Sequence, residues 1–137
     1  MEYKFESEKI NIAEDAQFAY NLEERLVNFS VSIIDFSTKF QKDHISLYFV
    51  DQLIRASSSA ALNYGEARGT ATQKDFTYKI SLVVKELRES FVCLKIMSRA
   101  EYFRDYFNNT EILNEANELV SIFVSALKKL NSQTAKK

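Results

Sequence analysis

Apolar residues recur along the chain at alternating steps of three and four, the spacing that places side chains on one face of an α-helix. Four segments show this pattern, and short polar breaks separate them. Their apolar positions, in chain order, are Leu22, Leu26, Phe29, Ile33, Phe36 and Phe40; Phe49, Leu53, Ala56 and Ala60; Phe76, Ile80, Val83, Leu87, Ser90, Leu94 and Met97; and Leu113, Ala116, Val120, Phe123, Leu127 and Leu130. The pattern predicts helices at about 17–41, 44–68, 72–99 and 110–130.

Capping residues stand at the breaks between these segments. Asp43 and Thr72 precede the second and third helices, and Thr110 with Glu111 opens the fourth. Oxygen-bearing side chains at such positions accept hydrogen bonds from the first free N–H groups of a helix. Gly69 follows the second helix, where we expect it to adopt a positive φ as the C′ residue.

The connections fix the expected architecture. Short breaks between helices force consecutive helices to lie antiparallel, so the chain is predicted to be all-α, an antiparallel up-down-up-down four-helix bundle. Residues 100–109 form the longest connection, and their aromatic side chains predict a packed loop. We expect an irregular acidic arm at 1–16, the bundle domain at 17–131 and a polar tail at 132–137.

Composition removes several classes of function. The 137 residues include no proline, two glycines, one cysteine and one histidine, so a glycine-rich phosphate loop and a disulfide framework are excluded. Di-iron bundles need Glu-x-x-His motifs, and His44 belongs to none. Cys93 has no histidine near it in the sequence to activate a thiolate. We therefore expect no cofactor, no metal and no enzymatic activity.

Nothing in the sequence indicates a membrane partner. The longest nearly apolar run, 119–127, is far shorter than the roughly 20 residues that a spanning helix needs. The chain starts with an acidic segment that does not resemble a secretory signal. These observations predict a cytoplasmic protein.

The first predicted helix carries a second apolar stripe, formed by Tyr20, Val27, Val31 and Ile34, on a face other than the core seam. The fourth helix adds a similar second set at Ile112, Leu119, Ile122 and Ala126. Contiguous apolar rows of this size are unusual on a soluble monomer. The first stripe is therefore predicted to be the interface of a homo-oligomer, unless the N-terminal arm and the 100–109 loop cover it.

The middle of the chain resembles a bacterial family. The run from Asp51 to Gly69, DQLIRASSSAALNYGEARG, is followed by KDF at 74–76, KISL at 79–82 and KELRES at 85–90. These motifs are similar to those of the four-helix-bundle proteins encoded in intervening sequences of 23S ribosomal RNA genes, over roughly residues 17–130. The resemblance implies an antiparallel bundle assembled into a homopentameric ring, and it implies no catalytic residues.

A more distant likeness, to the accessory protein of diversity-generating retroelements, implies binding to nucleic acid and a reverse transcriptase through a strongly basic surface. Here the net charge is −1, so that property does not transfer directly. The charge is unevenly spread: residues 1–51 hold five basic and ten acidic side chains, whereas 52–104 hold nine and five.

Two groups of polar residues remain as candidate sites. A basic edge on the third helix could follow a phosphate backbone or contact a partner, and consists of Lys74, Lys85, Arg88, Lys95 and Arg99. The same residues could be a solvated face, or could pair with the acidic first helix of a neighbouring copy. The second group, predicted to make inter-helix or inter-subunit polar contacts, is Arg55, Asn63, Glu66 and Arg68.

Two functional hypotheses follow. The first is a non-enzymatic, self-assembling scaffold or adaptor whose main partner is itself, as a pentamer. The alternative is an RNA- or DNA-binding accessory protein that uses the basic edge of the third helix and has a nucleic-acid enzyme as a further partner.

Overall fold

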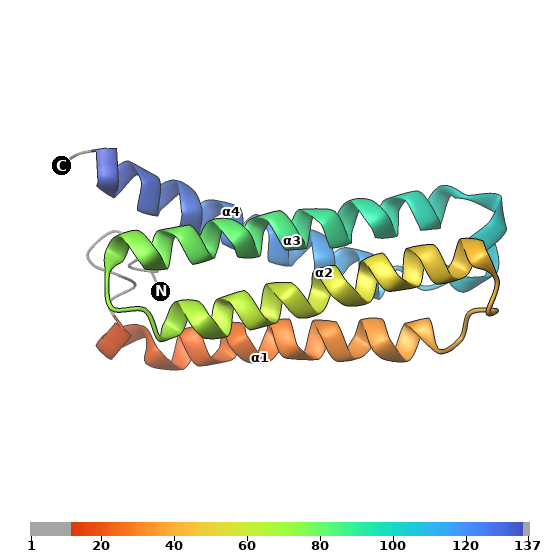
Figure 1. The fold of residues 1–137 in the computed structure, drawn as a ribbon, viewed down its shortest axis with the longest axis horizontal. Coiled ribbons are helices and arrows are strands. Elements are labelled where there is room, and N and C mark those ends of the chain that lie inside the picture. The colour runs from red at the N-terminus through yellow and green to blue at the C-terminus, as the bar shows by residue number, and fades with distance from the viewer. Residues whose placement is uncertain (1–11, 136–137) are drawn as a thin grey trace.

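The computed structural model describes the backbone of residues 12–135 and the side chains of residues 16–133. Four long helices make up this part of the chain: α1 (Ile12–Ser37), α2 (His44–Arg68), α3 (Gln73–Arg99) and α4 (Glu111–Ala135). A 3₁₀ helix, η1 (Glu101–Tyr106), lies between α3 and α4. The described residues contain no strand. The helices run up and down in turn around one core, which confirms the predicted all-α bundle (Figure 1).

Helix α1 differs from the prediction at both ends. It begins at Ile12, so residues 12–16 are helical and only 1–11 of the expected arm lie outside the described residues. It ends at Ser37, because Phe40 turns inward to pack beside Phe36, with ring centroids 4.9 Å apart. The apolar pattern extends past the helix because the turn buries its phenylalanine in the same core.

The helix starts follow the capping rules, with one change. The Asp43 carboxylate accepts the Ser46 N–H at 2.9 Å, and the Thr72 hydroxyl accepts the Asp75 N–H at 3.1 Å. At α4 the capping side chain is Asn109, whose Oδ1 accepts the Glu111 N–H at 2.7 Å, in place of the expected Thr110. Gly69 has a φ of −98°, so the expected positive φ is wrong.

Helix α4 is longer than predicted. It continues to Ala135, so residues 132–135 of the expected tail are helical. The second apolar set of this helix belongs to the core: Leu119 and Ala126 are buried, and Ile112 and Ile122 are packed against the buried cluster. The bundle therefore takes up most of this set: Leu119 and Ala126 are buried, and Ile112 and Ile122 are only partly exposed.

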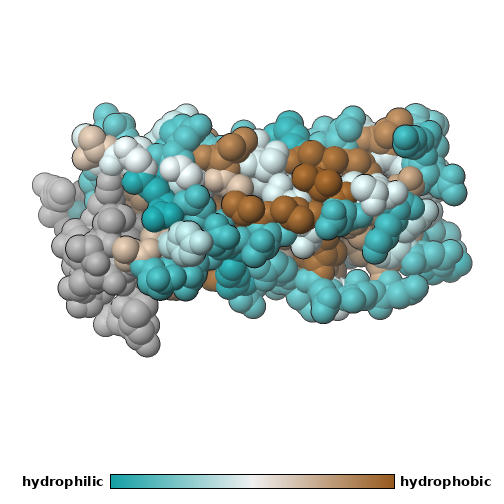
Figure 2. Space-filling view, turned by 90° about the horizontal axis from the view of Figure 1, so that it is seen from below, coloured by the Kyte–Doolittle hydropathy of each residue, from teal (hydrophilic) through white to brown (hydrophobic). Residues whose placement is uncertain are grey.

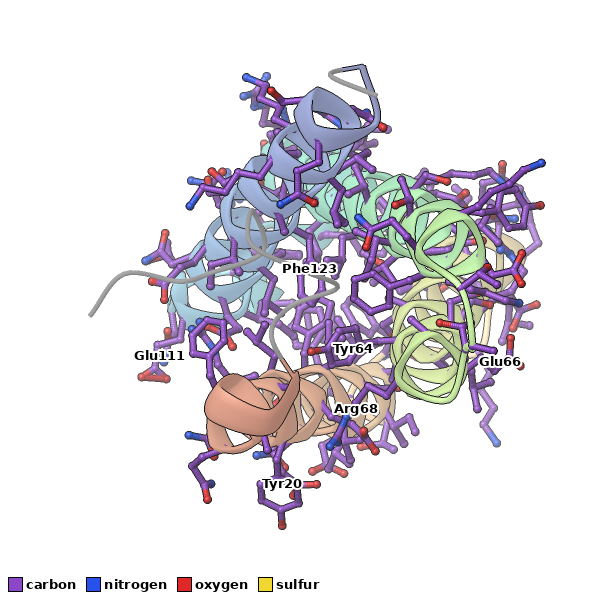
Figure 3. The ribbon with its side chains drawn as sticks, turned by 90° about the vertical axis from the view of Figure 1, so that its left-hand side faces the viewer. Tyr20, Tyr64, Glu66, Arg68, Glu111 and Phe123 are labelled. Carbon is purple, nitrogen blue, oxygen red and sulfur yellow. The ribbon has the colours of Figure 1, made fainter. Side chains whose placement is uncertain are left out.

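Among the described residues, Tyr64 is the one tyrosine in the buried core. Tyr64 is fully buried, its ring meets Phe123 edge-on at 5.2 Å, and its hydroxyl donates to the Ala19 carbonyl at 3.3 Å. Viewed along the bundle, Tyr64 and Phe123 lie between the helices, while Tyr20 projects outward from α1 (Figure 3). Burial raises the pKa of Tyr64 well above the ordinary value for a phenol.

Candidate interaction surface

The second stripe of α1 lies on the outside of the bundle. Tyr20, Val27, Val31 and Ile34 are 50, 40, 48 and 46% exposed. The 100–109 segment does not cover them, because Tyr106 and Phe107 pack against Phe40 and Phe36 instead. Within the described residues, this stripe therefore has no cover.

The neighbouring side of α2 extends the stripe into a continuous surface. A hollow of about 250 Å³ joins Ile34 of α1 to three apolar residues of α2, which are Leu47, Val50 and Ile54. We call the surface made by Tyr20, Val27, Val31, Ile34, Leu47, Val50 and Ile54 the α1–α2 face. Figure 2 shows hydrophobic side chains gathered along the side of the molecule on which α1 lies.

The residues predicted to form the basic edge of α3 lie on the surface of the bundle. Lys74, Lys85, Arg88 and Arg99 are exposed, and Lys95 is half-buried with its Nζ 4.6 Å from the centre of the Phe91 ring. Lys85 approaches Glu86 at 3.9 Å. Among the described residues, Lys74, Arg88 and Arg99 have no ion-pair partner.

The second polar group makes contacts between helices of the same chain. Arg55 of α2 binds Glu86 at 3.2 Å and also Glu89, both on α3. Glu66 binds Lys79 of α3 at 2.6 Å.

The remaining two members of this group, Arg68 and Asn63, form their ion pair and hydrogen bond with residues outside α3. Arg68 reaches across to Glu23 of α1 at 2.6 Å. Asn63 donates to the Ser59 carbonyl within α2 at 2.9 Å. The ion pairs of Arg55, Glu66 and Arg68 therefore link α2 to its two neighbours, whereas Asn63 makes its hydrogen bond inside α2 and not the predicted contact between helices.

An ion-pair cluster between α1 and α4 was not among the predicted contacts. Arg25 of α1 donates to Glu115 at 2.6 Å and to Glu118 at 2.8 Å, both on α4. The hydrogen bond that Arg25 donates to Glu115 is the main cause that raises the pKa of Arg25. The sequence separation of 90 residues gave no local signal for this pair.

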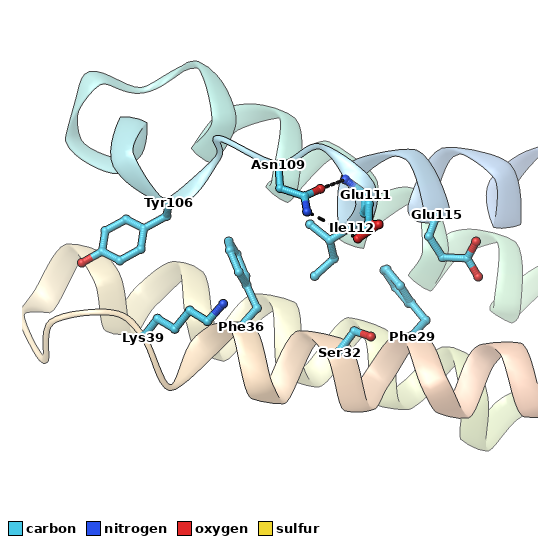
Figure 4. A pocket seen from close by; sticks show the side chains of 9 residues that line it. All are labelled: Phe29, Ser32, Phe36, Lys39, Tyr106, Asn109, Glu111, Ile112 and Glu115. Carbon is cyan, nitrogen blue, oxygen red and sulfur yellow. Dashed lines mark hydrogen bonds between the residues drawn. The ribbon is translucent and has the colours of Figure 1, made fainter.

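Next to this cluster, α1 and α4 enclose a hollow of about 320 Å³ (Figure 4). Its floor contains Phe29, Phe36 and Ile112, and its rim contains Lys39 and Glu111. Asn109, also on the rim, is already engaged in capping α4. These groups include no nucleophile with an adjacent base, so their arrangement matches no catalytic site.

Two further features bear on chemistry: the state of the Cys93 thiol and the grouping of residues that could bind a metal. Cys93 is buried, and that burial raises the pKa of its thiol to about 11. A thiol in this state is a poor nucleophile. In the part of the chain that is described, no three histidine, cysteine, aspartate or glutamate side chains gather as metal ligands would.

None of the described helices combines the length and apolar character that crossing a bilayer requires.

Fold and surface together define an antiparallel four-helix bundle with an apolar face that no described residue covers. Residues 20–125 match the family described as 23S rRNA-intervening sequence protein. The chain belongs to this family.

Among solved structures, the chain is similar to a protein of unknown function from the S23 ribosomal protein family of Bacteroides thetaiotaomicron VPI-5482. The two share 22% identity with a TM-score of 0.69, over 80% of this chain and 97% of the other. At this identity the likeness supports the fold alone. Among curated proteins, none matches the chain. Neither description names a reaction.

Proposed function

We propose that the protein is a non-enzymatic, self-assembling scaffold or adaptor of the cytoplasm, built from copies that dock through the α1–α2 face. The observation that carries this proposal is the exposure of Val27, Val31 and Ile34 in an unbroken apolar stripe. Each buried aliphatic side chain of this size contributes roughly 1.5–3 kcal/mol. Association would therefore recover free energy that the single chain leaves unused.

The proposed assembly is the homopentameric ring that the family resemblance implies. Sedimentation at micromolar concentration tests this, with an expected mass of five times 15.9 kDa, about 80 kDa. The variant Val31→Lys with Ile34→Lys should sediment as a monomer, because it places two charges in the contact. Wild-type protein that sediments only at 15.9 kDa would overturn the proposal.

A matched control comes from α4. Ser121 and Ser125 are exposed and lie one turn apart, so Ser121→Glu with Ser125→Glu also adds two charges to a helix surface. This control should assemble like wild type. Its dissociation would show that added charge, and not the position of the change, breaks the assembly.

A second candidate function is binding to RNA or DNA through the basic edge of α3. The supporting observation is that Lys74, Arg88 and Arg99 are exposed and unpaired among the described residues. A gel-shift assay at about 50 mM salt, where electrostatic binding is strong, tests it. The variant Lys85→Glu with Arg88→Glu should lose the shift, and absence of any shift by wild type would remove this candidate.

A further inference from the structure

A second apolar surface lies on the other side of α2. Tyr48 of α2 and Tyr78, Val92 and Ile96 of α3 are 60, 61, 48 and 49% exposed. Tyr48, Val92 and Ile96 border a hollow of about 180 Å³, which also contains Phe49 and Cys93. We call the surface formed by Tyr48, Tyr78, Val92 and Ile96 the α2–α3 face.

The helices that carry the two faces differ in charge. Helix α1 holds five acidic residues and one basic residue, whereas α3 holds six basic residues and three acidic ones. Around Val31, Glu24 and Asp35 lie seven residues before and four after it, which is the same side of the helix. Asp51 of α2, next to Val50, is exposed as well. Lys42 lines the hollow of this face as well, so three carboxylates stand against one ammonium group and the edge of the α1–α2 face is acidic on balance.

On α3, basic and apolar residues alternate along one line. Tyr78, Lys85, Val92 and Arg99 follow one another at intervals of seven, so all four lie on the same side of the helix. All four are exposed. Lys85 therefore lies between Tyr78 and Val92, and Arg99 lies beyond Ile96. Glu89 also borders the hollow of this face, but it is paired with Arg55 of the same chain.

From these observations we infer that the α1–α2 face of one copy docks on the α2–α3 face of the next copy. This inference rests on the proposed self-assembly and names the surface that receives the α1–α2 face. Two α1–α2 faces would bring like charges together, and so would two α2–α3 faces, whereas the mixed contact pairs acidic with basic edges. A contact between two different faces leaves one of each unused at the ends, so further copies add, and the assembly closes into a ring where the rotation from copy to copy completes a full turn.

The side of the bundle formed by α1 and α2 is large enough for such a contact. Two adjacent helices of 26 and 25 residues give a side roughly 37 Å long and about 20 Å wide, of which the α1–α2 face is the apolar part. A standard interface buries roughly 800 Å² of each partner, so it would include the polar positions around these seven apolar residues.

Gly65 is consistent with the approach of another chain. It lies exposed on α2, where a Cβ would meet nothing within 4 Å in the single copy. Ser58 and Ala61 precede it by seven and four residues, so the three small residues share the side of α2 that carries Ile54. Nothing in the single chain requires a glycine there, whereas a close neighbouring helix would.

Mixing two blocked proteins tests the contact. Val31→Lys with Ile34→Lys blocks the acidic face with positive charge, and Val92→Glu with Ile96→Glu blocks the basic face with negative charge. Each blocked protein should sediment alone at 15.9 kDa. Their equimolar mixture should form a 1:1 complex of about twice 15.9 kDa, because each contributes the face that the other lacks.

The other outcomes separate the inference from the proposed function. A Val92→Glu, Ile96→Glu protein that assembles like wild type would overturn this contact and leave self-assembly intact, as would a mixture that stays monomeric. If that protein also loses an RNA shift that wild type shows, the α2–α3 face serves nucleic acid. Wild-type protein that is itself monomeric would overturn the proposed function.

Helical content, measured by circular dichroism, checks that both blocked proteins fold. All four positions are 46–49% exposed in the single chain, so the changes leave the core untouched. If a double variant loses helical signal, the single changes Ile34→Lys and Ile96→Glu replace it in the same mixing experiment, with the same expected and contradicting outcomes.

Discussion

Gly65 lies in the last turn of α2 with open space around the place of a Cβ. Replacing it with alanine restricts the unfolded chain and removes nothing from the folded monomer. In the monomeric Val31→Lys, Ile34→Lys background, we expect Gly65→Ala to raise the free energy of unfolding by about 0.5 kcal/mol in a urea titration. In the otherwise wild-type protein the same methyl group should weaken assembly, and an unchanged dissociation constant would contradict close approach at this position.

Cys93 gives a second prediction at the scale of one residue. With its pKa raised from 9.0 to about 11 by burial, roughly one thiol in a thousand is ionised at pH 8, against about one in ten at the ordinary value. Alkylation by iodoacetamide at pH 8 should therefore be about 100-fold slower in the folded protein than in urea. Equal rates in the two states would show that the thiol is accessible and ordinary.

At the scale of single residues, the sequence predicts which side chains are buried better than it predicts which side chains form ion pairs. Heptad spacing identifies Phe29, Ile80 and Leu87 as core residues, and all three are buried. It does not reveal the fork from Arg25 to Glu115 and Glu118, because those residues meet only after α4 has returned to the side of α1. Long-range ion pairs depend on how helices rotate against each other, and local spacing does not record this rotation.

Between elements, the contact of α2 with α3 depends on a partly buried ion pair. Glu86 is 7% exposed, and Arg55 supplies its nearest cation at 3.2 Å. Arg55→Ala leaves this carboxylate with only Lys85, 3.9 Å away. We expect the free energy of unfolding to fall by about 1–2 kcal/mol, because the buried carboxylate loses its closest partner. The loss is no larger because solvent screens the half-exposed arginine.

Two further variants test the cause of that loss. Glu86→Met in the Arg55→Ala background should recover part of it by removing the unpaired carboxylate. The control Arg104→Ala breaks an ion pair to Glu101 that is more than two-thirds exposed on both sides, and should cost less than about 0.5 kcal/mol. If both arginine variants lose the same stability, burial of Glu86 is not the reason.

The helix ends show where sequence rules for elements succeed and fail. Asp43 and Thr72 cap α2 and α3 as predicted, because each stands directly before a continuous apolar pattern. The start of α4 is harder to place, since Asn109 and Thr110 can both cap and the structure uses Asn109. The end of α1 is masked by Phe40, which keeps the helical spacing although it lies in a turn.

For the molecule as a whole, short connections and four seams are enough to predict the bundle. The sequence also predicts the exposed stripe on α1, but it does not predict the α2–α3 face. The signal for that face is the spacing of Tyr78 and Val92, which lie fourteen residues apart on one side of α3. Lys85 and Arg99 occupy the alternate positions of the same line, so the pattern indicates a charged edge more strongly than an apolar surface. Only the fold shows that Tyr48 of α2 lies beside Val92 and Ile96 and makes the edge a surface.

Charge pairing between the two faces makes assembly depend on salt. The distance over which charges act falls from roughly 10 Å at 0.1 M salt to about 3 Å at 1 M, whereas apolar burial is not weakened. We expect the dissociation constant of the wild-type assembly, measured by sedimentation, to rise about tenfold over this range. The variant Asp35→Asn with Asp51→Asn should start with weaker assembly at 0.1 M and respond less to salt, because both changes remove negative charge beside the apolar stripe. Wild-type and variant proteins that respond equally would show that these carboxylates do not face the basic edge of α3.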